Sequence, residues 1–235
     1  MRNRLAAITF GFTLMMGMTS AIAVPLYQGL KNPTLTPKEQ GWTYLGTRQQ
    51  TAPTAQATSN GTVLDSGNIK NYAGYFIQAP FSLDRSGNGY ALTFRLKINS
   101  ESHVSDSRAG FSIIVMSAQA PGETQPYGVE LGFWTDKIWA LNQQAVRTET
   151  VSVNTTVTQD YLLYIQGNRY LLYTKGSSTP ILQGPLRQYT SYTPPPGFPN
   201  PYQTPNLIFM GDDTTSATGS ATISGMYVAP ARQIR

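Results

Sequence analysis

The chain has 235 residues, of which 40% are hydrophobic and only 12% are charged. That charged fraction is about half of what soluble domains usually carry. The 21 glycines, 16 prolines and 14 tyrosines are typical of a β-rich extracellular protein rather than of a helical cytosolic one. The absence of cysteine excludes disulfides, thiolate metal sites and a cysteine nucleophile.

The first 23 residues predict a secretory signal peptide. Arg2 and Arg4 precede an uncharged run over residues 5–18, and the Ala-Ile-Ala of residues 21–23 fits a small-x-small cleavage site. The run is short for a bilayer span and no later segment approaches the required length, so we expect no membrane anchor in the mature chain. We expect the protein to be secreted, either to the periplasm or outside the cell.

Cleavage after Ala23 removes Arg2 and Arg4 and lowers the net charge from +5 to +3. The remaining basic residues are scattered singly along the chain and form no basic run. The sequence therefore gives little support for a nucleic-acid partner.

Residues 24–62 predict an N-terminal arm or linker with one short strand, residues 63–229 a sandwich domain, and residues 230–235 a tail. Residues 90–98 give the cleanest alternation of the chain, with Arg95 and Lys97 on the face away from the core. The segment 186–205 predicts a long proline-rich loop that is either functional or packed over a sheet edge. Further strands are expected at 72–78, 109–115, 127–134, 137–142, 148–157, 161–166, 169–174, 207–210 and 222–228. We expect these strands to form two packed sheets, with the following side chains buried between them: Phe94, Phe111, Ile113, Leu131, Phe133, Ile165 and Phe209.

The two strands at 127–134 and 137–142 dominate the pattern. If Thr135 and Asp136 form a two-residue turn, counting along the strands places Gly132 opposite Trp139. One face of this hairpin is then apolar and belongs to the core. The other face carries a mixed set of side chains: Glu130, Gly132, Trp134, Lys137 and Trp139.

Two interpretations of this second face fit the sequence equally well. An aromatic ring shields the bare backbone of a glycine on the neighbouring strand, which gives Trp139 a structural role. Alternatively, Trp134 and Trp139 are a platform on which sugar rings stack. In that case Glu130 and Lys137, with Arg95 and Arg108 from neighbouring strands, would bind the sugar hydroxyls, and the bases favour an acidic glycan.

Four segments of the chain resemble the concanavalin A-like lectin and glucanase family, in the laminin G-like form of secreted bacterial proteins. They are RAGFSIIVMS, GVELGFWTDKIWAL, YLLYIQGNRYLLYTKG and NLIFMGDDTTSATGSATISGMYV. The resemblance covers residues 63–229 and implies an all-β fold, a two-sheet antiparallel jelly-roll sandwich with a concave face that contacts glycans. The fold hosts lectins, carbohydrate-binding modules, glycosidases, polysaccharide lyases and adhesion domains, so it does not fix the activity.

The enzymes of that family offer two tests of catalysis. Laminarinase-like glucanases carry an E-x-D-x-x-E strand, whereas the corresponding strand here holds Glu130 alone. Alginate lyases use a Gln-x-His strand, whereas the single histidine, His103, lies in a polar turn sequence. The sequence therefore identifies no catalytic residue, although a tyrosine could transfer a proton.

Asp212 and Asp213 follow a strand and are candidate ligands for calcium, which prefers six to eight oxygens. In a Gly-Asp-Asp-Thr turn, such acids more often cap their own backbone. The sequence thus predicts a secreted, non-catalytic carbohydrate-binding module. The alternatives are a structural or adhesion module with a protein partner and, third, a polysaccharide-degrading enzyme.

Overall fold

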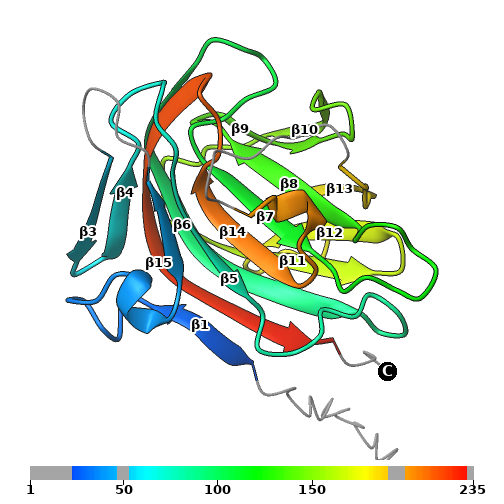
Figure 1. Ribbon diagram of the computed structural model, residues 1–235. Helices are drawn as coiled ribbons and strands as arrows, with labels where there is room; N and C mark the ends of the chain where they lie inside the picture. Colours follow the sequence, from blue (N-terminus) through cyan, green and yellow to red (C-terminus); the bar gives the residue numbers. More distant parts are fainter. Residues whose placement is uncertain (1–22, 47–52, 190–198, 232–235) are drawn as a thin grey trace, which may run out of the picture.

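The computed structural model describes residues 23–46, 53–189 and 199–231, so the predicted signal peptide lies outside the described residues except for Ala23. Two antiparallel sheets pack face to face (Figure 1). The helices of the described part are two short 3-10 turns, η1 (Lys38–Gln40) and η2 (Pro201–Gln203). Among the described residues, no helix has the length and apolar character needed to cross a membrane.

Each sheet combines strands from distant parts of the sequence, and every pairing is antiparallel. The 8-stranded sheet contains, in spatial order, β13 (Leu182–Pro185), β12 (Arg169–Thr174), β11 (Gln159–Gln166), β6 (Tyr90–His103), β15 (Ala217–Pro230), β4 (Gly61–Asp65) and β3 (Thr54–Thr58), with β1 (Val24–Gln28) paired to β15. The 7-stranded sheet contains β10 (Arg147–Ser152), β9 (Lys137–Leu141), β8 (Gly128–Phe133), β7 (Ser112–Met116), β14 (Leu207–Asp212), β5 (Ala73–Gln78) and β2 (Thr43–Gly46).

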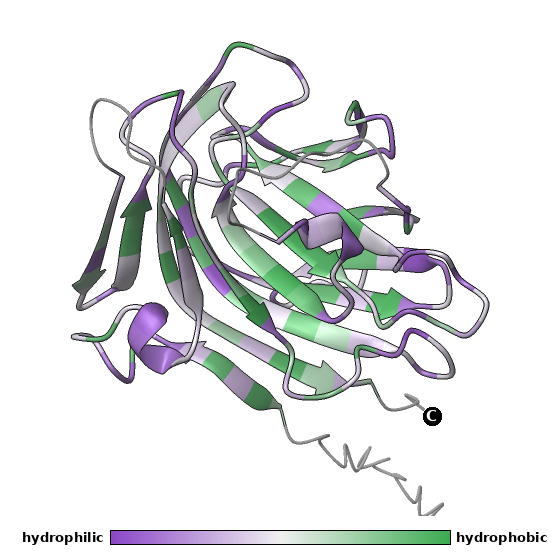
Figure 2. Cartoon of the chain, in the orientation of Figure 1, coloured by the Kyte–Doolittle hydropathy of each residue, from purple (hydrophilic) through white to green (hydrophobic). Residues whose placement is uncertain are grey.

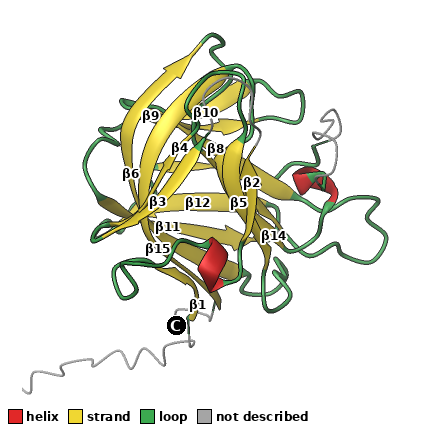
Figure 3. Cartoon of the chain, turned by 60° about the vertical axis from the view of Figure 1, so that its left-hand side comes forward, coloured by secondary structure: helices red, strands yellow, loops and turns green. Residues whose placement is uncertain are grey.

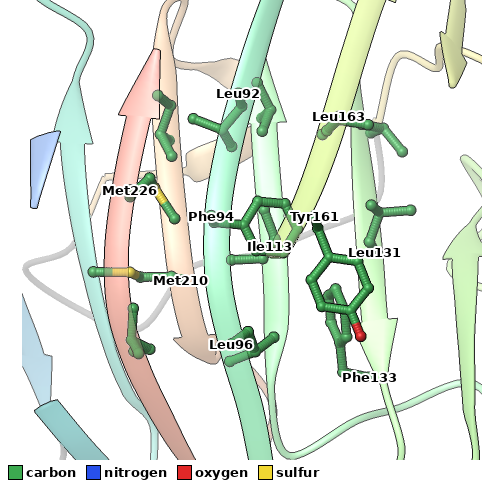
Figure 4. Close-up of a cluster of buried hydrophobic side chains, with 14 of the residues drawn as sticks. Leu92, Phe94, Leu96, Ile113, Leu131, Phe133, Tyr161, Leu163, Met210 and Met226 are labelled. Atoms are coloured by element: carbon green, nitrogen blue, oxygen red, sulfur yellow. The ribbon is translucent and has the colours of Figure 1, made fainter. Parts of the chain in front are cut away.

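The core between the sheets is built from alternate residues of facing strands (Figure 4). Phe94 of β6 and Tyr161 of β11 stack with ring centroids 5.2 Å apart. The ring of Phe133, from the opposite sheet, meets Phe94 edge-on at 6.1 Å. Each such aromatic pair adds about 0.5–1.5 kcal/mol beyond the area that it buries. These contacts fix how the two sheets sit on each other.

The central hairpin has the predicted register. Gly132 pairs with Trp139 and Phe133 with Ile138, and the amide of Trp134 donates to the carbonyl of Lys137 at 3.0 Å. Phe133 and Ile138 face the core, as expected. The hairpin predicted at Gly167 and Asn168 also forms, between β11 and β12.

A second apolar layer covers the other face of the 7-stranded sheet, and we call it the outer cluster. Figure 2 shows that β7 and β14 are apolar along most of their length, as expected for strands that are covered on both faces. The helix η2 lies against these two strands (Figure 1). The buried members of the outer cluster are Leu45, Ala109, Ile114, Met116, Trp134, Trp139, Leu141, Tyr189, Tyr202, Leu207 and Phe209.

The structure corrects two expectations about the fold. The segment 24–62 is not an arm, because it contributes β1, β2 and β3 to the two sheets and begins β4. The composition of this segment is polar and interrupted by prolines, so no clear alternation marks these strands in the sequence. Phe209 is buried, but in the outer cluster instead of between the sheets, where Ile208 and Met210 lie. A run of apolar residues without alternation gives no signal of which face is which.

Candidate functional site

Other side chains of the protein pack against the ring of Trp134. His103 stacks on it in parallel, with ring centroids 3.8 Å apart. The cationic groups of Lys137 and Arg147 lie 4.9 Å and 4.7 Å from its centroid, within the range of cation–π attraction. Its indole Nε1 donates to the carbonyl of Arg108 at 2.8 Å, and the residue is 5% exposed. Trp134 therefore has no free face for a sugar ring.

Trp139 is fully buried and covers Gly132. A Cβ atom placed on Gly132 would lie 2.4 Å from the Cζ2 atom of the Trp139 indole, so the ring rests directly on the glycine backbone. This is the shielding role that the sequence offered as the structural interpretation.

Two tyrosines from the segment 186–205 close the outer cluster over the hairpin. The Tyr189 hydroxyl accepts a hydrogen bond from the amide of Glu130 at 2.9 Å and donates to the carbonyl of Leu141 at 3.0 Å. The rings of Tyr189 and Tyr202 pack with centroids 4.6 Å apart. The expected indole platform is therefore wrong, because both indoles are buried, Trp134 beneath His103 and Trp139 within the outer cluster that these tyrosines join. Residues 190–198 of the loop lie outside the described residues.

Arg95 does not lie near the hairpin. It belongs to β6 in the 8-stranded sheet, where it forms a bidentate ion pair with Asp160 of β11 at 2.6 and 2.7 Å. The prediction that Arg95 joins the hairpin face is therefore wrong, since β6 pairs with β11 and β15 rather than with β8. Lys137 remains on the hairpin face and pairs with Asp136 at 3.5 Å.

The outer cluster ends at a pocket of about 240 Å³, which we call the outer pocket. It brings together two predicted site residues, Arg108 and Glu130, with Asp213, which the sequence offered as a metal ligand. Its lining is mostly polar and comes from the ends of several strands and their loops. The lining residues are Tyr72, Arg108, Glu130, Leu141, Gln143, Ala145, Tyr189, Tyr202, Asp213, Thr214, Thr215 and Ser216.

A buried pair of carboxyl groups forms one wall of the outer pocket. The Tyr202 hydroxyl contacts both Glu130 Oε2 and, at 3.3 Å, Asp213 Oδ2. The other Glu130 oxygen accepts from the Ser112 hydroxyl at 3.0 Å. A hydroxyl carries a single hydrogen, so it cannot donate to both carboxylates. The network is satisfied when Glu130 is protonated and donates to Tyr202, which in turn donates to Asp213.

Burial supports this assignment of the proton. Desolvation, aided by the negative charge of Asp213, raises the pKa of Glu130 to about 8. Desolvation also raises the pKa of Asp213, to about 6, while the positive charge of Arg108 opposes the rise. At neutral pH the pair therefore holds one proton, on Glu130, and one negative charge, on Asp213.

Asp212 and Asp213 do not converge on a common point. Asp212 caps its own turn by accepting from the amide of Thr214 at 3.1 Å, while Asp213 reaches Tyr202. Within the described ranges, no group of three or more histidine, cysteine, aspartate or glutamate side chains could hold a metal ion. This donor set does not fit the six to eight oxygens that calcium prefers.

Comparisons with known proteins bear on the fold. No family model and no curated protein matches the chain. Among solved structures, a carbohydrate esterase of the Shiga toxin-encoding bacteriophage phi24B is similar with a TM-score of 0.53, 13% identity, and coverage of 89% of this chain and 100% of that one. A Bacillus subtilis protein of unknown function with a galectin-like fold gives a TM-score of 0.51, 10% identity, and coverage of 89% and 98%.

A carbohydrate binding module of Bacillus subtilis, CBM66, gives a TM-score of 0.45, 11% identity, and coverage of 80% of this chain and 95% of that one. The fold is a concanavalin A-like jelly roll. At identities this low the likeness shows the fold alone, as the resemblance of the four sequence segments implied.

Sequence reasoning missed several residues of the outer pocket. Tyr72, Gln143 and Tyr202 lie in three segments that are far apart in the chain. Glu130 was singled out because an acid on a strand face opposite the core is unusual. The other three carry no comparable signal, since single tyrosines and glutamines are frequent throughout this sequence.

We expect substitutions of Trp139 and Gly132 to have non-additive effects on the free energy of unfolding, because the two residues are in contact. Trp139→Ala should cost about 3–5 kcal/mol of unfolding free energy, because it empties a buried site. Gly132→Ala should also destabilise the protein, since its Cβ would collide with the indole. In the double variant the alanine at position 132 should cost less, because the ring is gone. Denaturant unfolding of all four proteins tests this, and additive costs would contradict it.

Stability should also fall with rising pH. Because folding raises the pKa of Glu130 from an ordinary value near 4.5 to about 8, the folded state binds this proton more tightly than the unfolded state. The stabilisation is complete below about pH 4.5 and is lost as the pH rises towards 8. Glu130→Gln, which cannot ionise, should flatten the decline between pH 5 and pH 8 in denaturant unfolding. Parallel curves for the two proteins would exclude this role of Glu130.

Proposed function

We propose that this protein is a secreted, non-catalytic carbohydrate-binding module that holds a sugar unit in the outer pocket. The proposal rests on the composition of this pocket. Arg108, Asp213 and Gln143 line it together with the ring of Tyr72. A sugar offers hydroxyl groups that both donate and accept hydrogen bonds. Its C–H faces pack on aromatic rings, so this mixture of groups suits it.

The size of the outer pocket favours a small unit of a glycan. Its volume of about 240 Å³ lies below the roughly 300–1,000 Å³ of pockets that enclose drug-sized ligands. We therefore propose that it takes a terminal sugar or a single unit of a chain. A negatively charged sugar would meet Arg108 but also the carboxylate of Asp213, so this pocket gives an acidic glycan no clear advantage over a neutral one. The jelly-roll fold of the similar phage carbohydrate esterase agrees with a carbohydrate ligand.

Two neighbouring glutamines provide a matched test. Gln143 lines the outer pocket, whereas Gln144 does not, and both side chains are exposed. On a glycan array, Gln143→Ala should weaken binding to the recognised sugar by about tenfold, the effect of losing roughly 1.4 kcal/mol. Gln144→Ala should bind like the unmodified protein. Equal binding by the two variants, or no glycan bound by the unmodified protein, would favour the adhesion module with a protein partner.

The same array also tests whether glycan binding requires calcium. Because Asp212 and Asp213 diverge, binding should be the same with and without a calcium chelator. Loss of glycan retention on chelation would reinstate these two residues as ligands.

One observation favours hydrolysis as a second candidate function. Glu130 and Asp213 contact the same tyrosine hydroxyl, and one is protonated while the other is ionised at neutral pH. Retaining glycosidases use such a pair with the carboxyl groups about 5–5.5 Å apart. A reducing-sugar assay on bound glycans separates the two functions. Under the leading proposal no new reducing ends appear, whereas hydrolysis would produce them and Glu130→Gln would abolish them.

The predicted cleavage site suits the fold, which supports secretion. Val24, the first residue after the proposed cut, is also the first residue of β1 and pairs with Val228. Cleavage after Ala23 would therefore leave both sheets whole. N-terminal sequencing of protein recovered from outside the cytoplasm should begin at Val24. A start within β1, or retention of the full chain in the cytoplasm, would contradict the proposal.

A further inference from the structure

Three adjoining depressions cross the outward face of the 8-stranded sheet, on the side of the molecule opposite the outer pocket. Their volumes are about 290, 230 and 420 Å³. The first two share Leu30, Arg95 and Ser224, and the last two share Thr93 and Asp160, so the three depressions lie next to one another in a row. We call this the basic groove.

The floor of the basic groove is formed by β11, β6 and β15, which run side by side in the sheet (Figure 3). At its centre, Arg95 of β6 pairs in register with Asp160 on one side and with Gly225 on the other. Gly225 has no side chain to fill the space beside the guanidinium. The glycine in the sequence of β15 therefore leaves a depression beside Arg95.

The charges along the basic groove are strongly unequal. Four bases line it, namely Lys31, Arg95, Lys97 and Lys175, against one acid, Asp160. Asp160 is held by the Nε and Nη2 atoms of Arg95, which leaves the Nη1 group of Arg95 to other partners. The Lys175 side chain is 73% exposed and pairs with Asp160 only at 3.5 Å. The outer pocket is balanced by comparison, because Glu130 is protonated at neutral pH and the carboxylate of Asp213 is matched by the single base Arg108.

The basic groove also offers apolar and hydroxyl groups. Tyr227 lies at its centre, and Leu30 and Leu162 are large apolar side chains that are 49% and 38% exposed. Thr158 and Thr222 contribute hydroxyls near Lys97. Cations, exposed apolar surface and hydroxyls in one elongated groove match a ligand with carboxylates, C–H faces and hydroxyls.

We propose that the basic groove binds an acidic polysaccharide chain, one whose sugar units carry carboxylates, as a second site that is separate from the outer pocket. The proposal does not rest on the function proposed for that pocket. A nucleic acid fits less well, because its binding depends on neutralising a run of phosphates and this groove has four bases, two of them paired with Asp160. The hydroxyl-rich end of the groove suits sugar hydroxyls instead.

Binding of an oligogalacturonate, compared with a neutral oligoglucan of matched length, tests the proposal by calorimetry at low and high salt. The oligogalacturonate should bind more tightly and lose affinity with added salt, because ion pairs at a surface are screened. Lys97→Gln combined with Lys175→Gln should weaken binding by about tenfold. The matched control, Lys38→Gln with Lys70→Gln, removes the same charge from exposed positions outside the groove and should bind as the unmodified protein does.

Gly225→Val tests the shape of the groove without changing its charge. A Cβ at this position lies 3.5 Å from its nearest neighbours, an ordinary contact, so the fold should tolerate the change while the side chain enters the groove. It should reduce binding of the oligogalacturonate, whereas Gln144→Ala, an exposed position outside both the outer pocket and the groove, should not. Unchanged binding by Gly225→Val and by the double lysine variant would overturn the proposal. Equal loss in the control pair, equal binding of the neutral chain, or tighter binding of duplex DNA or anionic vesicles through the same lysines would also overturn it.

Discussion

The central strands of the 7-stranded sheet have no open face. Every residue of β7, β8 and β14 is buried, with one face of the sheet packed on the 8-stranded sheet and the other under the outer cluster. A polar group on these strands is cut off from water and must find its partners within the protein. This explains why the carboxyl group of Glu130 has two hydroxyl partners and a retained proton. It also confines ligand access to the margin of the cluster, where the outer pocket lies.

The parts of this fold that the sequence predicted correctly are local. The alternation along β6 and the counted turn of the β8–β9 hairpin depend on residues close together in the chain, so the period of two and the turn length suffice to set the faces. The same counting placed Trp139 on Gly132. It could not show that this face would be covered, because the covering contacts, His103 on Trp134 and Tyr189 on Glu130, join segments about 30 and 60 residues apart.

The errors about the site have one physical origin, which is the order of strands in space. Arg95 was on the predicted face of its strand but in the other sheet, since strand order is set by long-range packing that leaves no trace in local alternation. Conversely, the sequence indicated Glu130 as a sugar-binding residue and Asp213 as a calcium ligand, with no sign that they are neighbours. The pairing of β7 with both β8 and β14 brings them to the same tyrosine. The two outward surfaces of the sandwich thus differ in chemistry: the outer pocket has balanced charge, whereas the basic groove has an excess of bases.

The position of β15 in the 8-stranded sheet determines when the protein can fold. It lies in the middle of the 8-stranded sheet, where it pairs with β6 and also with β1 and β4, which precede it by more than 150 residues. Until residues 217–230 have been synthesised, those earlier strands lack the partner that completes their sheet, and Met226 and Val228 are missing from the core. Such non-local pairing delays folding until the whole sandwich is available. We therefore expect the sandwich to fold only after synthesis of its last strand, as a single cooperative unit and not strand by strand.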